Sequence, residues 1–495
     1  MIASRSCLLS MCVNPILRPS IHVLIGQLVP YRCIGKGCFV ASLYVSRLEE
    51  GSMTPQQNEL LCRVEGNAAM GRLMRQHWLP ACMIEEVAER DSSPLRVRLL
   101  GENIVVFRDT RGRIGALKEA CPHRGASLAF GRNEECGLRC LYHGWKFDVD
   151  GNAVDMSSEP VDAKLRATMK TKAYRVEEAG GFVWVWLGAD DAVAPFDPPN
   201  WCAAPADKIS IVKMHGGCNW AQILEGSIDS AHSSSLHSSN MPTASDVAGS
   251  TATDIAWLRP SADKAPRIEV DRTSFGFRYA AIRKPIVDAD KQDYVRMTLF
   301  VAPYTVHIPS NDQYHLSQML VPIDDVNTMF YWIAWHPTKG IAQDAWRTFC
   351  GAEVGKDVEP TTFNKVRNRE NNYLQDRELM KAGDFTGIYG IPAQDMAMWE
   401  SMGPIADRGE DRLGSSDKAI FTFRTLMYRA AQAVEKGEPA IGTVEPRVPH
   451  AKLMSFEGMV PKGDDWRVLN VSDEERAISN EAGKVGYRPA AEAGA

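Results

Sequence analysis

Alternating apolar and polar positions predict strands in two separate parts of the chain. In the first part, residues 95–109 and 180–188 carry β-branched and aromatic residues at every second position, with glycines between the runs. In the second part, residues 293–308 and 328–337 show the same pattern. Both parts are therefore expected to contain β-strands.

Helical spacing is confined to the region after residue 200 and to a short opening helix. Trp220, Ile223 and Leu224 recur at i, i+3 and i+4, which indicates one buried helical face. Residues 361–382 and 416–434 are also predicted helices, the second with Ser416 as its N-cap. An amphipathic helix is expected to follow Met53.

A Pro- and Asp-rich stretch, residues 189–201, indicates a linker between two domains. We therefore expect a small β-domain with its leading helix at 53–188 and a larger mixed domain at 202–472. Residues 473–495 are charged and rich in Ala and Gly, which is typical of a loose tail. Residues 1–52 are rich in Arg and Cys and poor in acids, and we expect them to be a disordered extension or a start-site artefact upstream of Met53.

Composition narrows the function classes. The formal charge of -6 does not indicate binding of nucleic acid. No run of apolar residues approaches the roughly 18 that span a bilayer. The 12 cysteines are scattered and form no compact disulfide framework, which favours a cytoplasmic protein. No G-x-G-x-x-G follows a strand, so a dinucleotide is not expected to bind here.

The first candidate metal site combines two thiols and two imidazoles on glycine-rich loops. Cys121 and His123 form a C-x-H pair, and Cys140 and His143 form a C-x-x-H pair. Such a set suits zinc, or a [2Fe–2S] cluster in which two histidines replace two cysteines on one iron. Zinc sites more often pair ligands of one type, but zinc stays an alternative at this point.

The second candidate site lies in "EGSIDSAHSSSLH". His232, His237 and a carboxylate would make the two-His, one-carboxylate triad of iron enzymes that use O₂. Asp229 and His232 share a helical face, but His237 does not, so the helix must break at Ser233–Ser235. Spacing alone does not select the third ligand among 62 acidic residues.

Together, "CPHRGA", "CLYHGWKFD" and "NWAQILEGSIDSAHSSSLH" resemble the Rieske non-haem iron aromatic-ring-hydroxylating oxygenases, over about residues 53–471. The resemblance implies an α+β chain: an N-terminal Rieske β-domain, then a catalytic domain whose antiparallel sheet is wrapped by helices (helix-grip, START-like). It also implies a [2Fe–2S] cluster on Cys121, His123, Cys140 and His143. Mononuclear Fe(II) would bind His232 and His237, with Asp229 as an inter-subunit electron relay.

The segment "IPAQDMAMWESMG" resembles the phthalate 4,5-dioxygenase subgroup, in which the aspartate of Q-D-x-x-x-x-E-S completes the iron triad. By that resemblance Asp395 is the third ligand, with Glu400 and Asp411 as distant alternatives. The subgroup acts on aromatic carboxylates. Arg259 and Arg296 lie where it places carboxylate-binding arginines, and Arg267, Arg272 and Arg283 are possible substitutes.

The implied protein is an oxygenase component that adds both atoms of O₂ to an aromatic carboxylate and gives a cis-dihydrodiol. Its partners would be an NADH-dependent flavin/iron–sulfur reductase and copies of itself in a homotrimer or stacked homohexamer. Two other functions stay open. One is a monooxygenase or O-demethylase acting on a chlorobenzoate, isophthalate or phenoxybenzoate type of acid. The other is a zinc-stabilised binding protein without redox chemistry.

Overall fold

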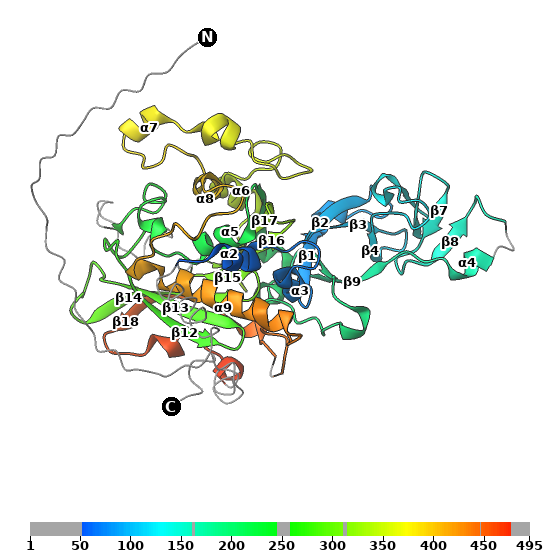
Figure 1. The fold of residues 1–495 in the computed structure, drawn as a ribbon. Helices are drawn as coiled ribbons and strands as arrows, with labels where there is room; N and C mark the ends of the chain where they lie inside the picture. The colour runs from blue at the N-terminus through cyan, green and yellow to red at the C-terminus, as the bar shows by residue number, and fades with distance from the viewer. Residues whose placement is uncertain (1–51, 161–163, 245–257, 310–313, 446, 477–495) are drawn as a thin grey trace, which may run out of the picture. The chain divides into compact units, whose positions relative to one another are not determined.

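The computed structural model describes residues 52–160, 164–244, 258–309, 314–445 and 447–476. The expected extension at 1–52 and tail at 473–495 therefore lie almost wholly outside the described residues. The described chain contains three antiparallel sheets and the helices that cover them (Figure 1). None of the described helices is long and apolar enough to cross a membrane.

Two sheets make up the N-terminal part. The larger has the strand order β1-β10-β9-β4-β3-β2 and the smaller the order β5-β6-β7-β8. Their strands are β1 (Trp78–Met83), β2 (Leu95–Leu99), β3 (Glu102–Arg108), β4 (Ile114–Lys118), β5 (Arg132–Glu134), β6 (Gly137–Arg139), β7 (Trp145–Phe147), β8 (Ala153–Met156), β9 (Ala173–Ala179) and β10 (Phe182–Trp186). Helices α2 (Pro55–Cys62) and α3 (Ala69–Met74) precede them, and α4 (Lys164–Thr168) follows β8.

The strands predicted in this part are confirmed. The loop between β2 and β3 shows why the sequence forms a hairpin here. Residues 95–109 form the hairpin β2–β3, joined by the two-residue loop Leu100–Gly101. Both loop residues have positive φ, 50° and 78°. Such a loop matches the right-handed twist of the flanking strands, which favours a tight hairpin at this point.

The C-terminal part is built on one eight-stranded antiparallel sheet, with the order β11-β17-β16-β15-β14-β13-β12 and β18 paired to β14. Its strands are β11 (Ile209–Gly216), β12 (Arg267–Thr273), β13 (Gly276–Arg283), β14 (Gln292–Val301), β15 (Thr305–Ile308), β16 (His315–Pro322), β17 (Thr328–Trp335) and β18 (Phe456–Pro461). The helices are α5 (Trp220–Ser227), α6 (Gln343–Cys350), α7 (Arg377–Lys381), α8 (Ile391–Ser401) and α9 (Lys418–Glu435). Figure 1 shows α9 lying across β12 and β13.

Two of the predicted helices differ from those observed. Residues 361–382 do not form one helix but a 3-10 segment, Arg369–Leu374, followed by α7. Asn372 and Tyr373 take left-handed φ values inside that segment, and asparagine tolerates this conformation better than most residues. The helix predicted at 416–434 is α9, but it begins at Lys418, and Ser416 lies in a preceding 3-10 turn instead of capping it.

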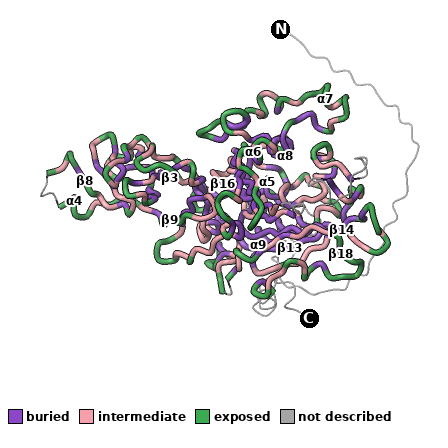
Figure 2. The backbone as a smooth tube through the Cα atoms, turned by 180° about the vertical axis from the view of Figure 1, so that it is seen from behind, coloured by how far each residue is buried: buried purple, intermediate pink, exposed green. Residues whose placement is uncertain are grey.

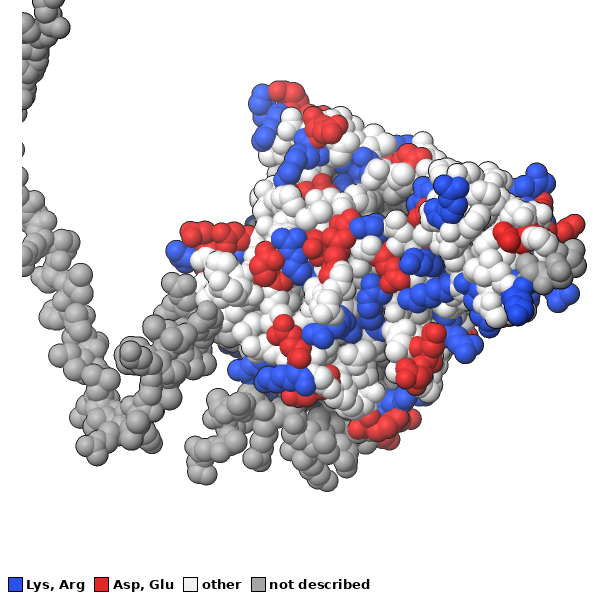
Figure 3. All heavy atoms as spheres, turned by 45° about the vertical axis from the view of Figure 1, so that its right-hand side comes forward, with Lys and Arg blue, Asp and Glu red and all other residues white. Residues whose placement is uncertain are grey.

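Burial follows the sheets. The tube in Figure 2 is buried along β13 and β16, whereas α4 and α7 are mostly partly buried or exposed. On the face in Figure 3, basic and acidic side chains are interspersed among the described residues. The C-terminal part therefore has a buried centre, and each charged side chain inside it needs a partner of opposite charge.

One buried charge network lies beside the helix that leads into the site. Glu225 on α5 accepts hydrogen bonds from Arg408 and Arg424, with Nε–Oε1 distances of 2.7 and 2.8 Å. Burial opposes ionisation of Glu225, but the two guanidinium groups hold its pKa below the usual value. Arg408 is fully buried, so it depends on this carboxylate for compensation of its charge.

We predict that Glu225→Gln lowers the free energy of unfolding by about 3–5 kcal/mol, because it leaves two buried guanidinium groups without their shared anion. The matched control is Glu59→Gln, which removes an exposed i,i+4 partner of Arg63 and costs less than about 1 kcal/mol. Denaturant titration of both variants measures the difference. Equal losses of unfolding free energy would show that the buried network stabilises the fold no more than the exposed ion pair does.

Candidate metal centres

The two Cys/His loops of the N-terminal part share one backbone geometry. The amide of Gly125 donates to the carbonyl of Cys121 at 2.8 Å, and the amide of Gly144 donates to the carbonyl of Cys140 at 3.0 Å. Both glycines have positive φ, 76° and 73°, which a residue with a Cβ rarely adopts. Each loop therefore turns sharply after its cysteine and carries the histidine on the turn.

The side chains on these loops fit the [2Fe–2S] ligand set. Cys121 and Cys140 are buried, and burial raises the pKa of Cys121 to about 11, so its thiolate requires a cation close by. The rings of His123 and His143 lie 4.3 Å apart, and His123 stacks on Trp145 at an angle of 10°. The Nδ1 atom of His123 is buried without a hydrogen-bond partner, as a ligand nitrogen would be.

The second site begins at the end of α5. Asn219 caps this helix by accepting from the amide of Ala221, and the predicted face of Trp220, Ile223 and Leu224 is buried as expected. The helix ends at Ser227, which is earlier than the break predicted at Ser233–Ser235. Asp229 is therefore not helical, and His232 opens a short 3-10 turn.

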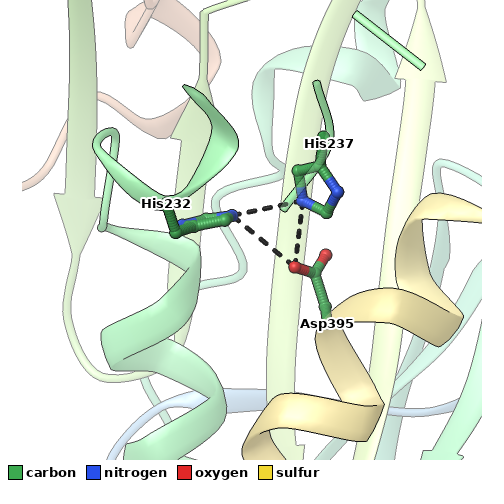
Figure 4. Close-up of side chains that lie close together, drawn as sticks. All are labelled: His232, His237 and Asp395. Atoms are coloured by element: carbon green, nitrogen blue, oxygen red, sulfur yellow. Dashed lines mark hydrogen bonds and ion pairs between the residues drawn. The ribbon is translucent and has the colours of Figure 1, made fainter. Parts of the chain in front are cut away.

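Helix α8 brings a carboxylate to the two histidines, and Figure 4 shows the three side chains pointing toward one another. The Nε2 atom of His237 lies 3.0 Å from Oδ1 of Asp395, and Nε2 of His232 lies 3.5 Å from the same oxygen. The two Nε2 atoms are 3.2 Å apart. Among the described residues, these are the only three His, Cys, Asp or Glu side chains whose ligand atoms lie within 4.8 Å of one another.

These distances fit a single metal ion. Ligand atoms about 2.1 Å from one ion lie roughly 3.0–3.4 Å from each other in octahedral or tetrahedral geometry. Oδ1 of Asp395 is buried and has no hydrogen-bond partner among the described groups, although a buried carboxylate oxygen is costly without one. Two imidazoles and one carboxylate on one side of the ion form the triad of non-haem iron sites.

Asp229 lies behind the triad. Its Oδ2 is 3.5 Å from Nδ1 of His232, on the side of the ring away from the metal position. Burial opposes ionisation of Asp229, but the interaction with His232 holds its pKa below the usual value. Burial likewise disfavours a cationic His232, but Asp229 and Asp395 together raise the pKa of that imidazole.

The two alternative carboxylates are engaged elsewhere. Glu400 accepts from Lys365 at 2.6 Å and from the hydroxyl of Tyr373 at 2.6 Å, and Asp411 accepts from Arg424 at 2.6 Å. Asp395 and Glu400 are five positions apart on α8, so they face different directions, as predicted from the helical repeat. Asp395 alone of the three lies with the histidines.

A cavity of about 880 Å³, its open mouth included, adjoins the triad and is lined by Arg259 and Arg296. Arg296 points into the cavity, whereas Val295 and Met297 pack in a core cluster on the other face of β14, as the strand alternation predicted. Each arginine has a buried Nε without a hydrogen-bond partner. Arg267 and Arg272 are exposed on β12.

A third buried arginine, Arg283, contributes charge to this region. Burial, together with the charges of Arg296 and Arg283, lowers the pKa of Arg259 to about 10. Burial and Arg296 also lower the pKa of Arg283. The cavity wall therefore carries concentrated positive charge, and an anion bound there would stabilise it.

Three further residues at the site were not predicted. Tyr294 lies two positions before Arg296 and so shares its face of β14, a signal that the alternation already contained. Its hydroxyl donates to Glu457, which also lies 3.5 Å from Nε of Arg296. Glu457 reaches the cavity through the pairing of β18 with β14, and Gln394 contacts His237 from α8. The pairing of Glu457 has no local sequence signal. Gln394 is the glutamine of the Q-D-x-x-x-x-E-S segment, but that segment did not predict its contact with His237.

Comparison with known proteins identifies the family. A family profile described as "LigXa C-terminal domain like" matches residues 185–485, and one described as "Rieske [2Fe-2S] domain" matches residues 77–168. The chain is 54% identical to the phthalate 4,5-dioxygenase oxygenase subunit of Pseudomonas putida, over 84% of this chain and 94% of the relative. The chain belongs to the Rieske oxygenase family.

Other relatives agree with this membership. The chain is 35% identical to the 3-chlorobenzoate-3,4-dioxygenase oxygenase subunit of Comamonas testosteroni, over 83% of this chain and 96% of the relative. The terminal oxygenase of carbazole 1,9a-dioxygenase from Novosphingobium sp. KA1 shares the fold, with a TM-score of 0.51 and 20% identity over 79% of this chain and 98% of that chain. The α+β fold expected from the sequence is thereby confirmed.

As a Rieske oxygenase subunit, this chain is an oxidoreductase with a [2Fe–2S] cluster and a mononuclear iron site. The zinc-stabilised binding protein is excluded by this membership. The named relatives are oxygenase subunits of multicomponent systems, so this Rieske oxygenase uses O₂ and receives electrons from a partner reductase.

We predict that Asp395→Ala lowers the iron content from about three to about two per chain and leaves about two sulfides, because only the mononuclear site loses a ligand. Asp411→Ala is the control, since its carboxylate pairs with Arg424 and not with the histidines. Iron and acid-labile sulfide assays measure both. A third iron retained by Asp395→Ala and lost from Asp411→Ala would reverse the assignment.

Proposed function

We propose that this Rieske oxygenase adds O₂ to an aromatic dicarboxylate of the phthalate type, at adjacent ring carbons, to give a cis-dihydrodiol. Each turnover consumes one O₂, two electrons and two protons. The electrons come from an NADH-dependent flavin/iron–sulfur reductase. The observation that carries the proposal is the buried arginine cluster beside the iron triad, and the phthalate oxygenase relative supports it.

Charge balance favours a dianion. Arg259, Arg283 and Arg296 are balanced at this site by Asp229, Asp395 and Glu457, so the protein groups alone are close to neutral. A divalent iron would then leave an excess of two positive charges. Two carboxylates on one ring compensate that excess, and the planar guanidinium fork binds each with two parallel hydrogen bonds.

Each metal group has a proposed set of residues. Cys121, His123, Cys140 and His143 hold the cluster, and His232, His237 and Asp395 hold the mononuclear iron. When bound, these groups supply one-electron transfer and activation of O₂. Asp229 contacts His232 and connects it to the cluster of a neighbouring subunit, which requires a homotrimer or a stacked homohexamer.

The chain's own residues orient the ring. Arg259 and Arg296 fix the carboxylates, so the ring edge away from them faces the triad. Leu316 and Trp332 line the same cavity and offer apolar surface to the ring while excluding water. This orientation would select two adjacent ring carbons distant from the carboxylates.

The product test uses purified protein, a phthalate-type reductase, NADH and phthalate under ¹⁸O₂. We expect a product that has gained two labelled oxygen atoms and two hydrogens, with one NADH consumed per molecule. Incorporation of one labelled atom, or loss of a substituent from a substituted benzoate, would instead identify a monooxygenase or O-demethylase. No oxidation of any aromatic acid would exclude the proposal.

We predict that Arg259→Met and Arg296→Met each raise the KM for phthalate about 10- to 100-fold, because each removes a charge-assisted hydrogen-bond pair worth about 1.5–3 kcal/mol. Benzoate, with one carboxylate, should discriminate less between wild type and variants. Arg267→Met is the control, since this residue is exposed on β12. Unchanged KM values in variants that retain three irons would contradict the anion site.

A further inference from the structure

Gln394 is a buried side chain that contacts an iron ligand without being one. It precedes Asp395 on α8 and is 1% exposed. Its Oε1 lies 2.8 Å from Nδ1 of His237, 157 positions away in the sequence. Its Nε2 donates to the carbonyl of Ile388 and to Oδ1 of Asn240, both at 2.9 Å. All of its hydrogen-bonding groups are therefore in use.

This arrangement fixes the tautomer of His237. The backbone carbonyl of Ile388 can only accept, so the amide nitrogen of Gln394 must face it, and the amide oxygen must face His237. An oxygen acceptor at Nδ1 places the ring proton there. Nε2 then carries the free lone pair, and this is the atom that lies 3.0 Å from Asp395 and 3.2 Å from His232.

The other histidine has a different partner. Nδ1 of His232 faces the carboxylate of Asp229 at 3.5 Å, whereas Nδ1 of His237 faces a neutral amide at 2.8 Å. A carboxylate can accept a proton or share charge with the ring, but an amide can only accept a hydrogen bond. The two ligands therefore have separate roles: His232 is connected to an ionic group, and His237 is held in one orientation.

We propose that Gln394 is a positioning residue that locks His237 in the Nδ1–H tautomer and directs its Nε2 at the mononuclear metal. The inference rests on the assignment of His237 as a ligand. Because Gln394 and Asp395 are adjacent on α8, one short segment supplies the third ligand and orients the second. Loss of the amide leaves the buried Nδ1–H without an acceptor and lets the proton move to Nε2, where it competes with the metal.

The test measures metal affinity and not turnover. The mononuclear iron is removed with a chelator while the cluster stays intact. The affinity for Co(II) is then measured by equilibrium dialysis. We predict that Gln394→Leu weakens Co(II) binding about 10- to 100-fold, with an unchanged cluster spectrum. Gln394→Glu should restore affinity to within about threefold of wild type, because one oxygen accepts from His237 and the other, protonated, donates to Ile388.

Gln222→Leu is the matched control. Gln222 is also 1% exposed, and its amide makes three hydrogen bonds, to the carbonyls of Trp399 and Gly403 and from the amide of Ala406. It touches neither histidine, so its loss should lower the melting temperature but leave Co(II) affinity within about threefold of wild type.

Two results would overturn the proposal: wild-type affinity in Gln394→Leu, or an equal loss of affinity in Gln222→Leu, which would indicate a structural role only. If Gln394→Leu does not fold, Gln394→Glu decides the matter, and a loss of tenfold or more would then exclude it. A failure of His237→Ala to lose the metal would instead disprove the ligand assignment on which the inference rests.

Discussion

The site depends on how closely α5 can approach α8. Gly226 lies at the end of α5 against Trp399 of α8, and a Cβ atom on Gly226 would be 1.9 Å from the indole Nε1. No side chain fits there, so the contact is available to glycine alone. Because the histidine turn follows directly after α5 and Asp395 lies one turn before Trp399, this close contact brings His232 and Asp395 near each other. Glu225, on the same helix, accepts a hydrogen bond from the distant residue Arg408.

Candidate residues that lie within short motifs could be predicted from the sequence. Contacts between residues far apart in the sequence could not. The Cys/His spacings, His232, His237 and the strand alternation around Arg296 are all properties of short segments. The early end of α5 at Ser227 was missed because Asp229 and His232 fit a helix by spacing, while the hydrogen bond from the Ala231 amide to Asp229 favours a turn instead. Glu457 reaches the site only through the pairing of β18 with β14, which leaves no pattern in its own neighbourhood. Gln394 stands in the Q-D-x-x-x-x-E-S segment, but its contact with His237 depends on helix packing.

The choice of Asp395 as the proposed third ligand rests on two separate arguments, family resemblance and geometry. Spacing left Asp395, Glu400 and Asp411 open, and resemblance favoured Asp395. The structure gives the physical reason, since Glu400 and Asp411 already neutralise Lys365 and Arg424, whereas Oδ1 of Asp395 is buried with no partner. Of these three carboxylates, Asp395 is the one without a compensating Lys or Arg, which supports its proposed role as a metal ligand.

The buried arginines at the site contrast with the negative net charge of the whole chain. The net charge is -6, yet three buried arginines lie beside the triad. Burial and the charge of Arg296 lower the pKa values of Arg259 and Arg283, whereas burial opposes the charge of Arg296 itself and Glu457 raises its pKa. Burial makes the charged forms of Arg259 and Arg283 costly, and an anion bound beside them would stabilise these charges. If a dianion binds at Arg259 and Arg296 as proposed, it would also change the electrostatic field at the neighbouring triad of His232, His237 and Asp395. Arg259 and Arg283 also donate to the carbonyls of Ser233 and Ser230, on either side of His232. Arg259, one of the two arginines proposed to bind the carboxylates, therefore also holds the turn that carries His232.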